Sequence, residues 1–129
     1  MPAAAAIKAL VVDDQLTMRT LIRSALHEIG IKDIADAADG EEGLRALIAR
    51  PAHLVISDFN MPKLDGLGFL RAVRANEQTK KSAFIMLTGR ADKDLVQRAM
   101  QFGVNNYVTK PFSPAQLRQK IEEVFGALT

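Results

Sequence analysis

The sequence predicts an α/β fold in which a doubly wound, five-stranded parallel sheet is covered by five helices. Three observations support this prediction. Short apolar runs alternate strictly with amphipathic helical patterns along the chain. The connections between them are short, which calls for a parallel sheet with helices on both faces and right-handed crossovers. No internal repeat or low-complexity linker divides the 129 residues, so we expect residues 1–129 to form a single domain.

The first predicted strand covers residues 7–12 and is followed directly by Asp13 and Asp14. Apolar residues at helical spacing then form a stripe that ends at Gly30, a residue type that commonly terminates helices. This stripe consists of Met18, Leu21, Ile22, Ala25, Leu26 and Ile29. Residues 34–38 form a second, weaker strand. The order strand, helix, strand is the first unit of the alternation.

The second helix is predicted from its start. Asp39, with Glu42 three residues later, is an N-cap signature. The apolar face that follows consists of Leu44, Leu47 and Ile48. Residues 53–57 form the third strand, and a loop through Pro62 and Gly66 leads to a third helix. The apolar residues of that helix are Leu67, Leu70 and Val73.

The remaining elements complete the alternation. Residues 83–87 form a fourth strand that is apolar on both faces, and a helical stripe closed by Gly103 follows it. That stripe consists of Leu95, Val96, Ala99 and Met100. Residues 107–108 lie in a fifth strand, and residues 113–116 start the last helix with a capping box and a proline at the first helical position. Its apolar residues are Leu117, Ile121, Val124, Phe125 and Leu128.

Composition excludes several classes of function. The chain has no cysteine, which excludes disulfides, thiolate zinc sites and cysteine nucleophiles. The net charge is +2, but the 17 basic residues are scattered among 15 acidic ones, so we expect no nucleic-acid partner. No apolar run approaches the length of a membrane span. Residues 1–6 lack the features of a secretory signal and are predicted to be a disordered tail, so we expect a cytoplasmic protein.

Chemically active side chains follow four of the five predicted strands. In chain order they are Asp13 and Asp14 after the first strand, Asp58 after the third, Thr88 after the fourth and Lys110 after the fifth. The carboxyl ends of parallel strands meet at one edge of a sheet, where ligands bind in such folds. We therefore expect three carboxylates, a hydroxyl group and an ammonium group to converge on one shallow site.

Three carboxylates in one place repel one another, and a divalent cation would offset that repulsion. A site made of oxygen ligands selects Mg²⁺ or Mn²⁺. Lys110 and Thr88 would then stabilise a transferring phosphoryl group through charge and position. Asp58 stands alone after its strand and is the candidate nucleophile, because a carboxylate can form an aspartyl-phosphate. Taken alone, Asp14 could merely cap the following helix, so the prediction depends on the whole set.

Five short motifs together resemble the receiver domains of bacterial two-component response regulators. The motifs are Val-Val-Asp-Asp at 11–14, Ile-Ser-Asp-Phe-Asn-Met-Pro at 56–62, Asp-Gly at 65–66, Leu-Thr-Gly at 87–89 and Tyr-Val-Thr-Lys-Pro-Phe at 107–112. The resemblance covers nearly the whole chain and is strongest to the stand-alone chemotaxis regulators of the CheY type. It implies a flavodoxin-like sheet with the strand order 2-1-3-4-5.

The resemblance also implies roles at a phosphoacceptor site. Asp58 matches the phosphorylated aspartate, and Asp13 and Asp14 match the metal-binding acids. Asn60 matches the position whose backbone carbonyl binds the metal together with these carboxylates. The implied cofactor is Mg²⁺ or Mn²⁺.

Further matches concern the phosphoryl group and the response to it. Thr88 and Lys110 match the residues that contact the phosphoryl group, and Tyr107 matches an aromatic switch residue. The bond between Lys110 and Pro111 is expected to be cis, as it is in the family. These matches imply that phosphorylation at one edge of the sheet changes the surface beside Tyr107.

The expected output face lies on the fourth helix, the fifth strand and the fifth helix. Its central residues are Lys93, Val96, Tyr107 and Arg118. Asn60 and Arg90, each two residues beyond a site residue, are expected to flank the path of the hydrolytic water. Arg90 would also place a positive charge at the rim of the site.

The resemblance implies a signalling module rather than an enzyme. A CheA-like histidine kinase would supply the phosphoryl group to Asp58, and the protein would catalyse its own phosphotransfer and autodephosphorylation. The implied output is chemotaxis, with a flagellar motor switch protein as the target and a phosphatase as a possible further partner. We expect a monomer.

Four alternative functions can be compared with the predicted chemotaxis regulator. A phosphorelay intermediate or a phosphate sink remains open, because sequence separates it poorly from a motor regulator. A haloacid-dehalogenase-like phosphohydrolase would carry a second acid where Asn60 lies. A flavodoxin-like cofactor binder is disfavoured because Asp13 and Asp14 would repel a phosphate in the first loop. A transcription factor would need a DNA-binding domain, for which no residues are left.

Overall fold

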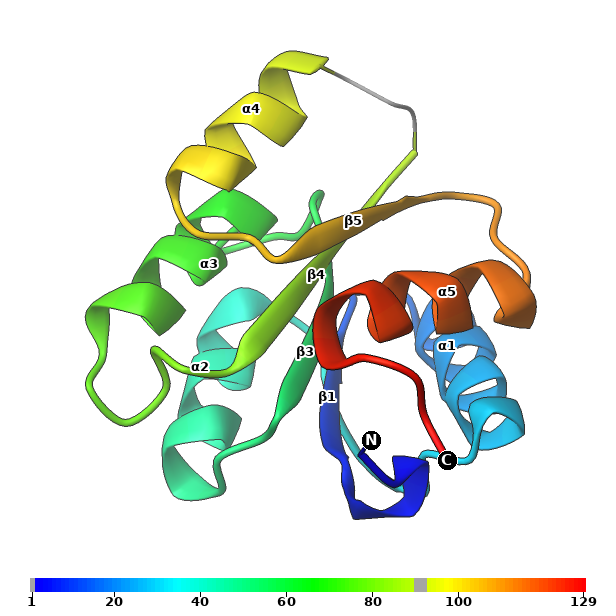
Figure 1. Cartoon of the computed structure of the whole chain (residues 1–129). Helices are drawn as coiled ribbons and strands as arrows, with labels where there is room; N and C mark the ends of the chain where they lie inside the picture. Colours follow the sequence, from blue (N-terminus) through cyan, green and yellow to red (C-terminus); the bar gives the residue numbers. More distant parts are fainter. Residues whose placement is uncertain (1, 90–92) are drawn as a thin grey trace.

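A five-stranded parallel sheet lies at the centre of the structure, a computed structural model that describes residues 2–89 and 93–129 (Figure 1). Its strands are β1 (Lys8–Val12), β2 (Asp33–Ala37), β3 (Leu54–Asp58), β4 (Ala83–Thr88) and β5 (Asn106–Thr109). They pair in the order β2-β1-β3-β4-β5. The predicted strand order is therefore confirmed, and the order reverses between β1 and β3, where ligand sites form in such sheets.

Five α-helices among the described residues cover the two faces of this sheet. They are α1 (Leu16–Ile29), α2 (Gly40–Ala49), α3 (Gly66–Ala75), α4 (Lys93–Gln101) and α5 (Pro114–Phe125). Helices α1 and α5 lie on one face, and α2, α3 and α4 lie on the other (Figure 1). The predicted α/β fold is thus confirmed. None of these described helices has the length and apolar character that crossing a bilayer requires.

The central strands divide their side chains between two apolar cores. Because successive side chains of a strand point to opposite faces, Leu54 and Ile56 join the core beneath α1 and α5, whereas Val55 joins the other core. All three side chains are fully buried. In the second core, Phe69 of α3 packs edge-on against Phe84 of β4, with ring centroids 5.4 Å apart. Burial on both faces explains why β3 and β4 are apolar along most of their length.

Helix ends follow the signals in the sequence. At the start of α2, the Asp39 side chain accepts a hydrogen bond of 2.8 Å from the Glu42 amide. At the start of α5, Ser113 and Gln116 form the predicted capping box. Helix α1 ends at Gly30, whose φ of 105° lies in the left-handed region that favours glycine. These signals fix where each helix leaves the edge of the sheet.

The tail predicted for residues 1–6 is instead ordered from Pro2 onward, so that prediction is wrong. Ala4–Ala6 form a short 3₁₀ turn, and Ala4 is buried in the core beneath α1 and α5. The Ala4 amide donates to the Thr129 carbonyl at 3.1 Å, and the Thr129 amide donates to the Pro2 carbonyl at 3.1 Å. The small Ala4 side chain is therefore buried against an apolar surface, and the two chain ends lie side by side in Figure 1.

Replacement of Asp39 tests the cap of α2. Asp39→Ala removes the acceptor for the Glu42 amide, and we expect a loss of roughly 1 kcal/mol in the free energy of unfolding. Urea denaturation near neutral pH measures this loss. Asp39→Asn keeps an acceptor and should lose less. An Asp39→Ala protein as stable as the wild type would show that the cap contributes nothing.

The same residue predicts a pH dependence. The hydrogen bond from the Glu42 amide, with a smaller contribution from Lys63, holds the pKa of the Asp39 carboxyl below its ordinary value. A lowered folded-state pKa adds stability that is present above the unfolded pKa of about 3.9 and is lost as the pH falls through the folded value. The stability of the wild type should therefore approach that of Asp39→Asn in acid. A gap that stays constant down to about pH 2, below the ordinary carboxyl range, would contradict this cause.

Candidate functional site

The side chains predicted from the strand ends converge at the carboxyl edge of the sheet. Asp13 follows β1, Asp58 ends β3, Thr88 ends β4 and Lys110 follows β5. Carboxylate oxygens of Asp13, Asp14 and Asp58 all lie within 4.8 Å of one another. The pairing of β3 with both β1 and β4 accounts for this convergence. Residues more than 40 positions apart in the chain thus form one acidic cluster.

Within the described residues, Lys110 forms the ion pair with Asp58, the candidate nucleophile of the acidic cluster. Its Nζ atom lies 2.8 Å from Oδ1 of Asp58, and the two side chains are only 23% and 9% exposed. The Lys110 amide donates to the Thr88 carbonyl at 2.7 Å, which fixes the start of the turn after β5. The bond to Pro111 is cis, as the family resemblance predicted. Shelter from solvent makes this ion pair stronger than an exposed one.

Asp13 carries a buried oxygen atom that lacks a hydrogen-bond partner among the described residues. Its Oδ1 accepts a hydrogen bond of 2.9 Å from the Gln15 amide, whereas Oδ2 is buried and unpartnered. Burial raises the pKa of the Asp13 carboxyl above its ordinary value, and the nearby charges of Asp58 and Asp14 add to this rise. Lys110 and the Gln15 hydrogen bond act in the opposite direction. A buried carboxylate beside two others calls for a cation.

The acidic cluster fits a hard divalent cation. Asp13, Asp14 and Asp58 offer only oxygen ligands, and Mg²⁺ and Mn²⁺ prefer such ligands. Asp14 and Asn60 are exposed, so the site has an open side on which water or a phosphate oxygen can complete the coordination. The residues present therefore suit the predicted metal.

A cleft of about 360 Å³ opens beside the acidic cluster. Its lining consists of Asp58, Phe59, Asn60, Thr88, Gly89, Leu95 and Lys110. The hydroxyl oxygen of Thr88 is buried and has no hydrogen-bond partner among the described residues. The Asp58 carboxylate, the Lys110 ammonium group and the unpartnered Thr88 hydroxyl group therefore share one cleft. These are the parts that stabilise a transferring phosphoryl group.

Gly66 packs closely against the backbone of Asp58 and Phe59, which line the cleft. The sequence pattern did not predict this contact. A Cβ atom on this residue would lie 2.7 Å from the Asp58 carbonyl oxygen and 2.8 Å from the Cα of Phe59. The Gly66 amide donates to the Phe59 carbonyl at 2.8 Å. Only glycine permits so close an approach of two backbone segments. The Asp-Gly pair at 65–66 was the available signal. It indicated only a loop at Gly66 and not the close backbone contact.

Part of the predicted output face is assembled in the structure. A groove of about 250 Å³ is lined by Lys93, Val96, Gln97 and Tyr107. Tyr107 is half-buried, and Nζ of Lys120 lies 5.2 Å from the centre of its ring. Helix α4 and strand β5 thus bring the predicted Lys93, Val96 and Tyr107 together.

One residue predicted for the output face, Arg118, is not among those that line this groove. Arg118 lies on α5, where its Nε atom is 3.5 Å from the Glu122 carboxylate and one Nη atom donates to the Leu128 carbonyl at 3.5 Å. The Arg118 side chain therefore contacts residues near the C-terminal end of the chain. Arg90, predicted at the rim of the cleft, lies outside the described residues.

Comparison with known proteins finds receiver domains and chemotaxis proteins that are similar over nearly the whole chain. The family model of the response regulator receiver domain matches residues 9–122. A probable chemotaxis protein CheY from Rhizobium etli is 56% identical over 128 residues, which is 99% of each chain. The solved structure of chemotaxis protein CheY4 from Vibrio cholerae is 31% identical, covers 96% of this chain and 99% of its own, and gives a TM-score of 0.85.

A further solved structure bears on the metal. The receiver domain of a sensor histidine kinase from Pseudomonas aeruginosa is 28% identical to this chain and gives a TM-score of 0.83. The match covers 94% of this chain and 98% of that one. That receiver was solved with a magnesium ion coordinated in its active-site cleft.

Thermal unfolding tests the metal-binding cluster. Mg²⁺ at about 100 times its Kd should stabilise the protein by about 2.7 kcal/mol, because it binds only the folded state. Asp13→Asn removes a buried charge that Asp14 and Asp58 repel, so the variant should be more stable than the wild type without metal and should lose most of the Mg²⁺ effect. Asp33→Asn, at a half-buried acid on β2 that pairs with Arg50 outside the acidic cluster, is the control that keeps it. A full Mg²⁺ effect in Asp13→Asn would remove Asp13 from the site.

Proposed function

The chain belongs to the response regulator receiver domain family, and on that premise we propose that it is a chemotaxis regulator phosphorylated on Asp58 by a histidine kinase. The ion pair between Asp58 and Lys110, formed beside the other carboxylates and the unengaged Thr88 hydroxyl, is the observation that carries this proposal. The similarity to proteins named CheY over nearly the full chain supports the chemotactic role.

Phosphorylation of Asp58 is a displacement at phosphorus. A carboxylate oxygen of Asp58 forms the new P–O bond, while the bond from phosphorus to the donor, a histidine nitrogen in the kinase, breaks and its electron pair leaves with the imidazole. Lys110 lies 2.8 Å from the Asp58 carboxylate and offsets negative charge on the phosphoryl oxygens. The Thr88 hydroxyl supplies a hydrogen bond to the same group. A bound Mg²⁺ would add positive charge and help to orient the phosphoryl oxygens.

The phosphoryl group is lost again by hydrolysis that the protein itself assists. Asn60 lines the same cleft as Asp58, so an attacking water must pass this side chain. Asn60 and Arg90 are the residues that we expect to control the lifetime of the phosphorylated state. The arrangement suits a signalling protein that accepts and releases phosphate, not an enzyme that turns over free substrates.

The output follows from the phosphoryl group as a new partner for Thr88. Oxygen atoms on phosphorylated Asp58 give the buried Thr88 hydroxyl an acceptor, which draws this side chain toward the phosphoryl group. Strands β4 and β5 pair, with Thr88 opposite Thr109 and Met86 opposite Tyr107. Because Met86 and Thr88 point to the same face of the sheet, Thr88 lies diagonally across from Tyr107, and we expect its movement to free space next to this half-buried ring. We expect the Tyr107 ring to turn inward and the groove beside it to receive a flagellar motor switch protein.

Partners and location follow from the same role. The phosphodonor is a CheA-like histidine kinase, the target is a motor switch protein, and a phosphatase can shorten the signal. The protein acts as a monomer, a single domain, in the cytoplasm.

Labelling with acetyl phosphate tests the phosphoacceptor. With Mg²⁺ present, the wild type should gain one phosphoryl group, and Asp58→Asn should gain none because an amide is not a nucleophile. Intact-mass spectrometry measures both. Asp33→Asn is the matched control and should be labelled normally. Equal labelling of Asp58→Asn would overturn the assignment, and full labelling in excess chelator would remove the metal from the reaction.

Binding of a motor-switch peptide tests the output. Beryllofluoride, which mimics the phosphoryl group, should tighten binding about tenfold or more, within the usual range of coupling between two sites. Thr88→Ala should reduce this gain and still bind beryllofluoride, because Asp58 and Lys110 remain. Fluorescence anisotropy of the labelled peptide measures both. Equal affinity with and without the mimic would refute a phosphorylation-controlled face, and transfer of phosphate to a histidine phosphotransfer protein would favour a relay.

A further inference from the structure

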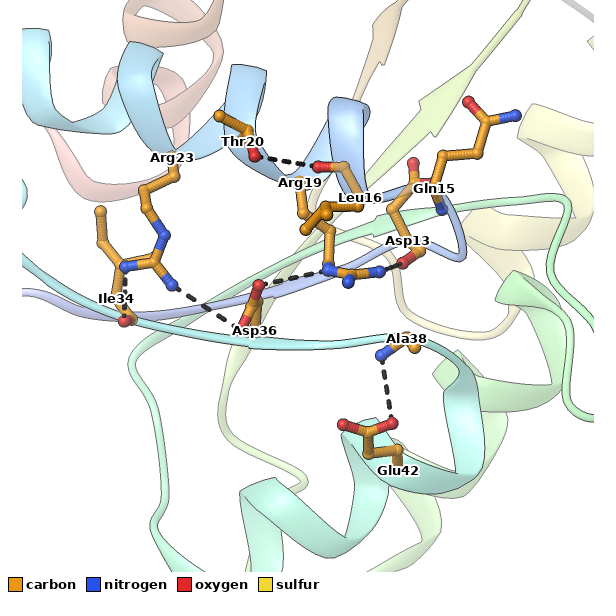
Figure 2. Close-up of polar contacts among 10 residues, drawn as sticks. All are labelled: Asp13, Gln15, Leu16, Arg19, Thr20, Arg23, Ile34, Asp36, Ala38 and Glu42. Atoms are coloured by element: carbon orange, nitrogen blue, oxygen red, sulfur yellow. Dashed lines mark hydrogen bonds and ion pairs between the residues drawn. The ribbon is translucent and has the colours of Figure 1, made fainter.

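Arg19 connects the acidic cluster to the edge of the sheet. This residue lies in the first turns of α1, and its side chain is only 16% exposed. One Nη atom donates to the backbone carbonyl of Asp13 at 2.7 Å, and Nε donates to Oδ2 of Asp36 on β2 at 3.2 Å. Figure 2 shows the guanidinium group between these two acceptors. The side chain thus joins α1, β2 and the turn after β1.

Asp13 is held at every polar atom except one. Its amide donates to the Ala37 carbonyl at 3.1 Å, its carbonyl accepts from Arg19, and its Oδ1 accepts from the Gln15 amide at 2.9 Å. The remaining atom, Oδ2, is the buried oxygen without a partner among the described residues. Arg19 supplies the only side-chain hydrogen bond to Asp13 within residues 2–89 and 93–129. Arg19 holds the backbone of Asp13 and the Gln15 amide holds Oδ1, so the orientation of the free Oδ2 atom depends on both contacts.

Arg19 acts on Asp13 through position, not through charge. The Asp36 carboxylate at 3.2 Å compensates the guanidinium charge, and the hydrogen bond to Asp13 reaches the backbone carbonyl, not the carboxylate. The planar guanidinium fork suits two fixed acceptors at once. Loss of the fork would let the turn after β1 relax, and the direction of the Asp13 carboxylate would relax with it.

A neighbouring arginine provides an internal comparison. Arg23 also lies on α1 and pairs with Asp36, with an N–O distance of 3.7 Å. It also donates a hydrogen bond of 3.1 Å to the Ile34 carbonyl on β2. Both arginines thus tie α1 to β2, but only Arg19 reaches the acidic cluster (Figure 2).

We propose that Arg19 is a positioning residue for divalent metal binding, because it fixes the Asp13 carbonyl and so aims Asp13 Oδ2 into the acidic cluster. The inference rests on the proposed function, in which Asp13 binds Mg²⁺. Groups that orient metal ligands commonly change metal affinity 10- to 100-fold when they are removed. Arg19 belongs to this class although it contacts neither the metal nor the phosphoryl group.

A matched pair of variants tests the role of Arg19. Arg19→Met and Arg23→Met each keep an unbranched apolar stem, remove every donor and break one contact with Asp36. NMR titration with Mg²⁺ gives the Kd from the amide shifts of Asp13 and Asp14. We expect Arg19→Met to raise the Kd about tenfold or more, and Arg23→Met to stay within about twofold of the wild type. An unchanged Kd in Arg19→Met, or an equal rise in Arg23→Met, would overturn the proposal.

A second readout separates metal binding from general loosening of the fold. The rate of labelling by acetyl phosphate, followed against Mg²⁺ concentration, should show a higher half-saturating concentration in Arg19→Met and a maximal rate close to that of the wild type. A lowered maximal rate at saturating Mg²⁺ would overturn the positioning role. If Arg19→Met does not fold, Arg19→Gln, which keeps a polar side chain but lacks the fork, serves for the same titration.

Asp13→Asn is the reference variant that separates failure of the proposed metal site from failure of the proposed role of Arg19. If this variant binds Mg²⁺ like the wild type, the proposed metal site itself is wrong. If Asp13→Asn loses Mg²⁺ binding while Arg19→Met keeps it, the proposed function stands and only the role of Arg19 fails.

Discussion

Repulsion among the carboxylates of Asp13, Asp14 and Asp58 is the constraint on which the rest of the structure depends. Their oxygens lie within 4.8 Å because β1 and β3 are neighbours and both end at the same edge of the sheet. The fold offsets part of this repulsion with the Lys110 ammonium group, 2.8 Å from Asp58. Burial raises the pKa of the Asp13 carboxyl, the charges of Asp58 and Asp14 add to that rise, and a divalent cation would relieve both effects. Stability without metal is thereby exchanged for affinity toward metal and phosphate.

The sequence predicted the parts of the site that depend only on chain order. Asp13, Asp58 and Thr88 follow or end apolar strands, and the carboxyl ends of parallel strands must meet, so their convergence needed no knowledge of side-chain packing. Helix caps such as Asp39 could also be predicted from the sequence, because the capping hydrogen bond joins residues only three positions apart. The strand order itself came from the family resemblance, since alternation alone allows several orders.

What the sequence could not supply depends on long-range packing. Residues 1–6 were expected to be disordered, yet Ala4 is buried against the core because Thr129 pairs with the same segment. Leu21 and Met100 belong to apolar helical stripes but are 54% and 66% exposed, because each stripe is wider than the surface it covers. In the sequence nothing distinguishes Arg19 from a solvent-exposed basic residue. Its hydrogen bond to the Asp13 carbonyl depends on the folded turn after β1.

The two sides of the site differ in how tightly they are held, and this difference explains where a signal can arise. On the α1 and β2 side, the backbone and Oδ1 of Asp13 are fixed by Ala37, Arg19 and Gln15. On the β4 and β5 side, the Thr88 hydroxyl has no partner within the described chain, and a groove lies open beside Tyr107. A phosphoryl group can shift an equilibrium only through contacts that differ between two states. On the metal side the backbone and Oδ1 of Asp13 already have partners, so we propose that the conformational response travels through Thr88 toward Tyr107.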